Sequence, residues 1–190
     1  LQSYAKMHLV PFGERTPFRD SIPLLRDIDW KALTGDLGPA EFAPGTQHTI
    51  FAHPRADFAT LICFESVFPD LVRRSVDYGA QLLVNITNDS WFGHTAGPYQ
   101  HAQLAILRAI ENRIAMARCA TSGISVFIDP FGRTFQATDI FEPAVRVHEL
   151  PIGRGHTFYT RHGDIFARLA LLTAIVLAGL ALLQSRTRKE

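Results

Sequence analysis

Apolar and polar positions along the chain follow two periods, one typical of strands and one typical of helices. Short apolar runs rich in β-favouring residues predict strands at residues 60–62, 81–86, 115–120, 123–128 and 145–150. Helical periodicity, each time opened by a proline, predicts helices at residues 69–78 and 98–113. The order of strand, helix, strand, helix and then a mostly β tail predicts an α/β fold.

The helix expected at residues 98–113 carries large apolar side chains at three- and four-residue spacing. They are Leu104, Leu107, Ile110 and, just beyond it, Ile114. Because residues at this spacing lie on one side of a helix, they predict a single buried face.

The N-terminal part of the chain has no long periodic segment. Residues 4–14 form a short extended segment ended by Pro11 and Gly13, so Lys6 is expected at a strand end and Glu14 in a loop. Residues 15–45 form a long connection rich in proline and in apolar side chains. Such long loops are commonly functional lids, so this one is expected either to pack on the domain as a lid or to dip into a membrane surface.

The C-terminal segment differs from the rest of the chain because it is almost free of charge. Residues 165–183 contain one charge, Arg168, and a helix of this length spans about 28 Å, close to the hydrocarbon thickness of a bilayer. The pattern predicts a transmembrane helix after a domain at residues 1–160, with a buried core helix as the alternative. The basic tail at residues 184–190 would then lie in the cytoplasm and the domain outside, under the positive-inside rule.

Composition narrows the chemistry of the chain. Its 190 residues allow one substantial domain, and 19 Lys and Arg against 18 Asp and Glu give no broad cationic face for a nucleic acid. The two cysteines lie far apart and the eight histidines show no ligand spacing, so neither a disulfide framework nor a metal or cofactor is expected. The first residues resemble the interior of a domain, which predicts a fragment whose N-terminal part is missing.

Cys63 is the candidate nucleophile, because it follows an apolar strand and precedes a helix that Pro69 opens. The positive end of a helix favours the thiolate, which is the form that attacks carbonyl carbons. The alternative is a small buried hydrophobe, a common role for free cysteines. His94 and His101 raise a further alternative, a papain-type Cys–His pair, whereas Cys119 is expected to be buried and inert in its strand.

Three blocks of sequence, taken in order, resemble the carbon–nitrogen hydrolase (nitrilase) superfamily. They are residues 6–14, then Ile-Cys-Phe-Glu at 62–65, and Asn-Ile-Thr-Asn-Asp-Ser-Trp-Phe-Gly at 85–93. Within that superfamily the chain resembles the membrane-bound apolipoprotein N-acyltransferase branch, with further likeness at residues 97–101, 108–113, 121–125 and 157–161. The expected membrane helix at the end of the chain fits the same branch.

The resemblance implies a nitrilase-like α-β-β-α sandwich, incomplete at its N-terminus here, with a Glu-Lys-Cys triad. Cys63 would be the nucleophile and Lys6 its cationic partner, although Lys6 by itself could equally be a surface lysine. Glu14 and Glu65 match two further active-site glutamates, and the backbone N–H of Phe64 would help to bind the oxyanion. The general-base glutamate belongs upstream of Lys6, so this 190-residue chain is expected to be inactive alone.

The activity that the resemblance implies is transfer of a phospholipid acyl chain, through a thioester on Cys63, to the α-amino group of the N-terminal diacylglyceryl-cysteine of a lipoprotein. The expected partners are a phospholipid donor, a diacylated lipoprotein acceptor and a membrane. The expected location is the bacterial inner membrane, with the catalytic domain on its periplasmic side. The alternatives are a nitrilase-type amidase acting on small amides and a membrane-anchored binding domain without activity.

The block at residues 85–93 also supplies candidates for a substrate pocket. Trp91 and Phe92 could line an acyl pocket, but aromatic residues that follow a strand are also common in protein cores. Asn88 and Asp89 could form hydrogen bonds near the site, or simply a turn.

Overall fold

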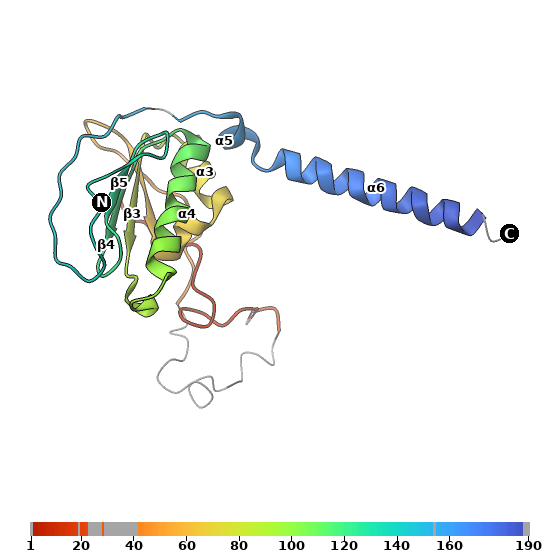
Figure 1. Ribbon diagram of the computed structural model, residues 1–190, viewed down its shortest axis with the longest axis horizontal. Helices are drawn as coiled ribbons and strands as arrows, with labels where there is room; N and C mark the ends of the chain where they lie inside the picture. The colour runs from red at the N-terminus through yellow and green to blue at the C-terminus, as the bar shows by residue number, and fades with distance from the viewer. Residues whose placement is uncertain (1, 19, 23–27, 29–41, 154, 188–190) are drawn as a thin grey trace.

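The computed structural model describes residues 2–18, 20–22, 28, 42–153 and 155–187 (Figure 1). Most of the predicted lid at residues 15–45, and the end of the basic tail, lie outside the described residues. Within them, a sheet covered by helices precedes one long helix that extends away from it (Figure 1).

A single six-stranded sheet, in the order β1-β2-β3-β4-β5-β6, forms the centre of the fold. Its strands are β1 (Ile50–Phe51), β2 (Phe58–Ile62), β3 (Leu82–Thr87), β4 (Met116–Ala120), β5 (Val126–Ile128) and β6 (Thr134–Phe135). β2, β3 and β4 are parallel to one another, and the other pairs are antiparallel. The predicted α/β class is therefore confirmed, with a mixed sheet, although β1 and β6 were not predicted.

Two helices, α3 (Pro69–Asp77) and α4 (Gly97–Asn112), connect the parallel strands and lie on the same side of the sheet (Figure 1). The two strand–helix–strand connections have the same hand and proceed in the same direction along the sheet, so their helices lie on the same side. Alternate strand side chains point toward the helices, so Leu61, Leu83 and Met116 are completely buried. Each such side chain contributes roughly 1.5–3 kcal/mol to stability by leaving water.

The buried face of α4 is not the one predicted. Leu107 and Ile110 are 46% and 37% exposed, and Leu104 is only half-buried. The buried face instead combines small and polar residues: Pro98, His101, Ala102, Ala105, Arg108, Ala109 and Asn112. Small side chains let the helix approach its neighbours closely. His101, Arg108 and Asn112 each form side-chain hydrogen bonds, which apolar periodicity does not reveal.

Two segments predicted to be extended strands are irregular. Residues 145–150 form no strand, and Val145 and Val147 are 87% and 85% exposed. Residues 4–14 likewise contain no strand, so Lys6 does not lie at a strand end. Side-chain acceptors replace a strand partner for part of this backbone, as the site below shows.

Two helices complete the described chain. α5 (Phe158–His162), which the periodicity did not predict, is tied to the end of α4 by a hydrogen bond of 2.9 Å from Thr160 Oγ1 to Asn112 Oδ1. α6 (Ile165–Thr187) confirms that residues 165–183 are helical, and its exposed leucines exclude the buried core helix. In the part of the chain that the structure describes, however, no helix is long and apolar enough to cross a membrane, so the predicted transmembrane helix is not supported.

Candidate active site

The candidate residues meet at one edge of the sheet. β2 and β3 run parallel in register, with Ile62 opposite Ile86, and β4 continues the parallel set. Their carboxyl ends therefore lie side by side, which is where open α/β sheets place ligands. Cys63 follows β2 directly, and the loop that follows β3 begins at Asn88.

Cys63 occupies the sharp turn between β2 and α3. Its φ of 53° lies in the left-handed region, where a residue with a Cβ is strained by about 1–3 kcal/mol. A short 3₁₀ helix, η2 (Cys63–Val67), follows and leads into α3. The predicted strand, turn and helix are thus confirmed, and Cys63 is half-buried rather than fully buried.

The second cysteine was predicted wrongly. Cys119 lies in β4, as expected, but it is exposed. Its neighbour Arg118 points toward the helices and is buried, so Cys119 points to the opposite face of the sheet.

A cavity of about 310 Å³ opens beside Cys63. Its lining comprises Val10, Pro11, Gly13, Glu14, Cys63, Phe64, Asn88, Trp91, Phe92 and His101. Trp91 and Phe92 are 77% and 40% exposed, so the alternative that they are core residues is wrong. Asn88 does form a turn, accepting a hydrogen bond of 3.1 Å from the Ser90 N–H, and it lines the cavity as well.

Lys6 is linked to this cavity by its ion pair with Glu14. Its Nζ lies 2.8 and 2.7 Å from the two carboxylate oxygens of Glu14, one of which also accepts a hydrogen bond of 2.8 Å from the Val10 N–H. The Lys6 side chain is only 9% exposed, so a surface lysine is the wrong interpretation. Glu14 lines the cavity and Lys6 does not, so the ion pair fixes the ammonium group behind the Glu14 carboxylate.

Glu65 does not line the cavity, and its carboxylate holds neighbouring backbone in place. It is completely buried, and its Oε1 accepts hydrogen bonds of 2.8 Å from the Tyr4 hydroxyl, 2.7 Å from the Met7 N–H and 3.2 Å from the His8 N–H. Its Oε2 accepts one of 2.7 Å from the Ile62 N–H. Burial and the hydrogen bond to Glu65 raise the pKa of Tyr4. Glu65 thus fixes the irregular N-terminal segment to the end of β2.

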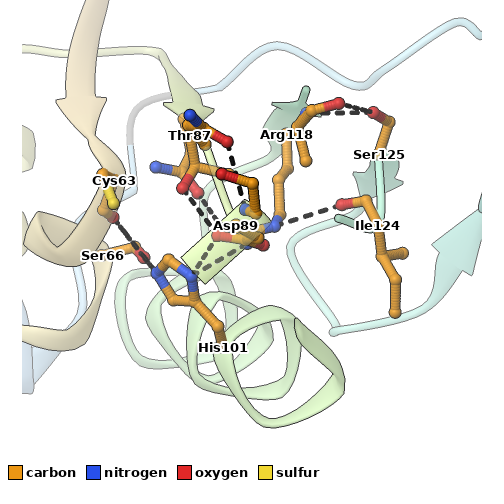
Figure 2. A network of polar contacts seen from close by, with 12 residues as sticks. Cys63, Ser66, Thr87, Asp89, His101, Arg118, Ile124 and Ser125 are labelled. Atoms are coloured by element: carbon orange, nitrogen blue, oxygen red, sulfur yellow. Dashed lines mark hydrogen bonds and ion pairs between the residues drawn. The ribbon is translucent and has the colours of Figure 1, made fainter. Parts of the chain in front are cut away.

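Behind Cys63 lies a buried polar network (Figure 2). Asp89 forms the hydrogen bonds near the site that were predicted for it, but the network as a whole was not predicted. Arg118 NH2 donates to Asp89 Oδ2 at 2.8 Å, and Asp89 Oδ1 lies 2.9 Å from His101 Nδ1. The other ring nitrogen of His101 lies 3.2 Å from the carbonyl oxygen of Cys63. We call Arg118, Asp89 and His101 the rear network. No motif in the sequence indicates this network, because its polar side chains become buried only when the chain folds.

Electrostatics bind the rear network together. Burial raises the pKa of Asp89, but the hydrogen bond from His101 and the charge of Arg118 outweigh it, so that its pKa lies below the usual value. Burial lowers the pKa of Arg118, and Asp89 opposes that effect. Gly123 packs so closely on Asp89 that a Cβ there would overlap the carboxylate.

A papain-type Cys–His pair is not what the structure contains. His101 approaches the backbone carbonyl of Cys63, and His94 stacks on Phe141 with ring centroids 4.4 Å apart. Among the described residues, no group of His, Cys, Asp or Glu side chains is arranged to hold a metal ion.

Comparisons with known proteins agree on a family. The family described as carbon-nitrogen hydrolase matches residues 1–157. The chain is 40% identical over 176 residues to the apolipoprotein N-acyltransferase of Geobacter metallireducens, covering 93% of this chain and 32% of that protein. It is 39% identical over 191 residues to the protein of the same name from Chlorobaculum tepidum, covering 98% and 35%. The chain thus spans about a third of the length of these curated relatives.

The chain is also similar to proteins of solved structure. Among them is an amidase from Nesterenkonia sp., with 28% sequence identity, a TM-score of 0.47, and coverage of 58% of this chain and 44% of that chain.

Proposed function

The chain belongs to the carbon–nitrogen hydrolase family, and on this premise we propose that it carries the nucleophile of an N-acyltransferase. The enzyme moves a phospholipid acyl chain, through a thioester on Cys63, to the α-amino group of the N-terminal diacylglyceryl-cysteine of lipoproteins. The observation that carries the proposal is the cavity lined by Cys63, by Glu14, which is the ion-pair partner of Lys6, and by the exposed side chains of Trp91 and Phe92. The names of the curated relatives support the choice of substrates.

In the first half-reaction, the Cys63 thiolate attacks the ester carbonyl of the phospholipid. A carbon–sulfur bond forms, the ester carbon–oxygen bond breaks, and a lysophospholipid leaves with the proton that the thiol gave up. The Lys6 ammonium and the Phe64 N–H stabilise the oxyanion of the tetrahedral intermediate. In the second half-reaction, the lipoprotein amine attacks the thioester carbonyl. A carbon–nitrogen bond forms, the carbon–sulfur bond breaks, and a proton from the amine passes to the departing Cys63 sulfur.

The thiol proton needs an acceptor, and the proposed acceptor is a glutamate upstream of Lys6, as the family resemblance implies. Glu14 and Glu65 are poor candidates, because Glu14 binds Lys6 with both oxygens and Glu65 accepts four hydrogen bonds.

The proposed location is the bacterial inner membrane, with the catalytic part, residues 1–160, on its periplasmic side. Trp91 and Phe92 give the cavity an apolar mouth suited to an acyl chain. α6 presents exposed apolar side chains, among them Phe166 at 83% and Leu171 at 63% exposure, which suit contact with lipid.

The test is intact-protein mass spectrometry of the full-length gene product after incubation with phospholipid vesicles. The expected result is an added mass of one acyl chain that hydroxylamine removes. The adduct should be absent from Cys63→Ala and present in Cys119→Ala, a matched control for the other free cysteine. If no adduct forms while small amides are hydrolysed, the enzyme is an amidase instead.

A further inference from the structure

The carbonyl oxygen of Cys63 is held from behind. Ser66 Oγ donates to it at 3.2 Å, and His101 Nε2 lies 3.2 Å from it and 3.2 Å from the same Ser66 hydroxyl (Figure 2). These contacts do not reach the thiol, so they act on the backbone of the nucleophile.

The neighbours of the His101 ring determine its protons. Nδ1 lies 2.9 Å from a carboxylate oxygen of Asp89, an acceptor, and 3.2 Å from Arg118 NH2, a donor. At Nε2, a bare lone pair would face the Cys63 carbonyl oxygen, which is also an acceptor. A hydrogen on Nε2 removes that repulsion and leaves the Ser66 hydroxyl free to donate to the carbonyl. The geometry thus favours a hydrogen on Nε2.

Asp89 holds the Nδ1 side of the His101 ring. It is 0% exposed, and His101 is 5% exposed, so water does not screen the pair. Arg118 is also 0% exposed and fixes the second oxygen of Asp89. Arg118 is itself fixed, because it donates from Nε to the Ile124 carbonyl at 3.2 Å and from NH1 to Asn85.

The peptide group that His101 holds also carries a candidate oxyanion donor. The carbonyl of Cys63 and the N–H of Phe64 belong to one planar trans peptide unit and therefore point in opposite directions. Fixing the carbonyl toward His101 fixes the N–H away from it. The left-handed φ of Cys63 is costly for a residue with a side chain, so this peptide needs an external partner to stay in place.

We propose that His101, supported by Asp89 and Arg118, is a positioning residue that holds the Cys63–Phe64 peptide and so aims the Phe64 N–H at the oxyanion. The inference rests on the proposed acylation of Cys63 and extends it to residues that do not touch the substrate. It requires a hydrogen-bond donor at the place of Nε2.

Two substitutions separate the two ring nitrogens. In His101→Gln, the longer amide can place an N–H where Nε2 lies, and in His101→Asn, the shorter amide can place one only near Nδ1. The full-length gene product would be acylated with p-nitrophenyl butyrate, and the burst of p-nitrophenolate would give the acylation rate; Cys63→Ala is the blank. We expect Asn to lower this rate about 10²-fold with little change in KM, and Gln to restore it to within about tenfold.

Alkylation of Cys63 by iodoacetamide is the second measurement, because that reaction forms no oxyanion. Its rate should change much less than acylation in both variants. Equal impairment of Gln and Asn, or a wild-type burst in Asn, would overturn the proposal. Because the butyrate ester replaces the phospholipid, failure of the lipid reaction alone would refute the proposed function and leave this inference standing.

Wild-type protein offers a test that survives misfolding of the variants. Nitrogen-15 NMR of labelled histidine should show a hydrogen on Nε2 of His101. A ring with an unprotonated Nε2 cannot donate to the Cys63 carbonyl and would overturn the proposal.

Discussion

The two sides of Cys63 carry side chains of opposite character. On the cavity side lie exposed aromatic side chains, with Trp91 77% exposed, and the irregular segment that carries Glu14. On the rear side lie Asp89 and Arg118, charged and 0% exposed. The charged groups are thus away from solvent and the apolar groups face it, the reverse of an ordinary surface and core.

This contrast separates binding from support. Apolar side chains that remain exposed contribute little to folding stability, so they can contact an acyl chain on the cavity side without destabilising the fold. A buried ion network tolerates little displacement, because losing one member leaves an unpaired charge in a medium that solvates it poorly. The rear side therefore should govern stability and geometry, and the cavity side should govern substrate affinity.

Removing the Asp89 carboxylate should have the largest effect on stability. Asp89→Ala leaves Arg118 and His101 buried without their counter-ion, so we expect the free energy of unfolding to fall by about 3–5 kcal/mol. Urea unfolding of the full-length gene product measures it. Asp139→Ala, at an exposed position, is the matched control and should stay within about 0.5 kcal/mol of wild type. Similar losses in both variants would contradict the importance of the rear network.

Glu65→Gln should have the next largest effect. The amide keeps one acceptor oxygen, but its NH2 group then faces an N–H donor of the Tyr4–His8 segment or of Ile62. An unsatisfied buried donor costs about 1–3 kcal/mol, and the segment that carries Lys6 should loosen. Thermal unfolding and the acylation rate should both decline, whereas exposed Glu142→Gln should leave them unchanged. A stable but inactive Glu65→Gln would instead indicate a direct chemical role.

Acid should weaken the rear network. The pKa of Asp89 is depressed in the folded protein, so its contribution to stability is complete above its unfolded pKa of about 4 and is lost as pH falls through the folded value. The difference in unfolding free energy between wild type and Asp89→Asn should be constant above about pH 5 and shrink below it. Urea titrations at several pH values measure this difference, and a difference independent of pH would contradict the assignment.

Trp91→Ala tests the cavity side and should have the smallest effect on folding. Because Trp91 is mostly exposed, stability should change by less than about 0.5 kcal/mol, while KM for phospholipid should rise about tenfold, equivalent to ~1.4 kcal/mol. Iodoacetamide should still alkylate Cys63 at the wild-type rate. Phe131→Ala, an exposed aromatic on the β5–β6 turn, is the control and should leave KM unchanged. An equal rise in KM for both variants would argue against an acyl site at Trp91.

The sequence located the elements that local chemistry dictates. α3 and α4 begin close to the prolines that predicted them, and β3 lies within one residue of the expected run. The turn at Cys63 was also predictable, because an apolar strand followed by a polar break and Pro69 is typical of a strand-to-helix turn. Lys6, Glu14 and Glu65 were singled out by the family resemblance rather than by local chemistry, and the structure places Glu14 with Cys63 in the lining of one cavity.

Periodicity failed where packing depends on partners rather than on hydrophobicity. Leu107 and Ile110 predicted the wrong face of α4, because alanines and hydrogen-bonded polar side chains occupy the buried one. Residues 145–150 alternate like a strand but pair with none. A strand exists only where a neighbour supplies its ladder, and no single stretch of sequence contains that neighbour.

By itself, the sequence determined which residues are candidates for the chemistry, because a thiol before a helix and a lysine in a recognisable block are local features. Only the tertiary structure decided what supports them. Asp89, His101 and Arg118 come from a loop, a helix and a strand, and they form a network only because parallel strands bring their carboxyl ends to one edge. A charge becomes buried through the fold around it, and that is a property of the folded chain rather than of any segment.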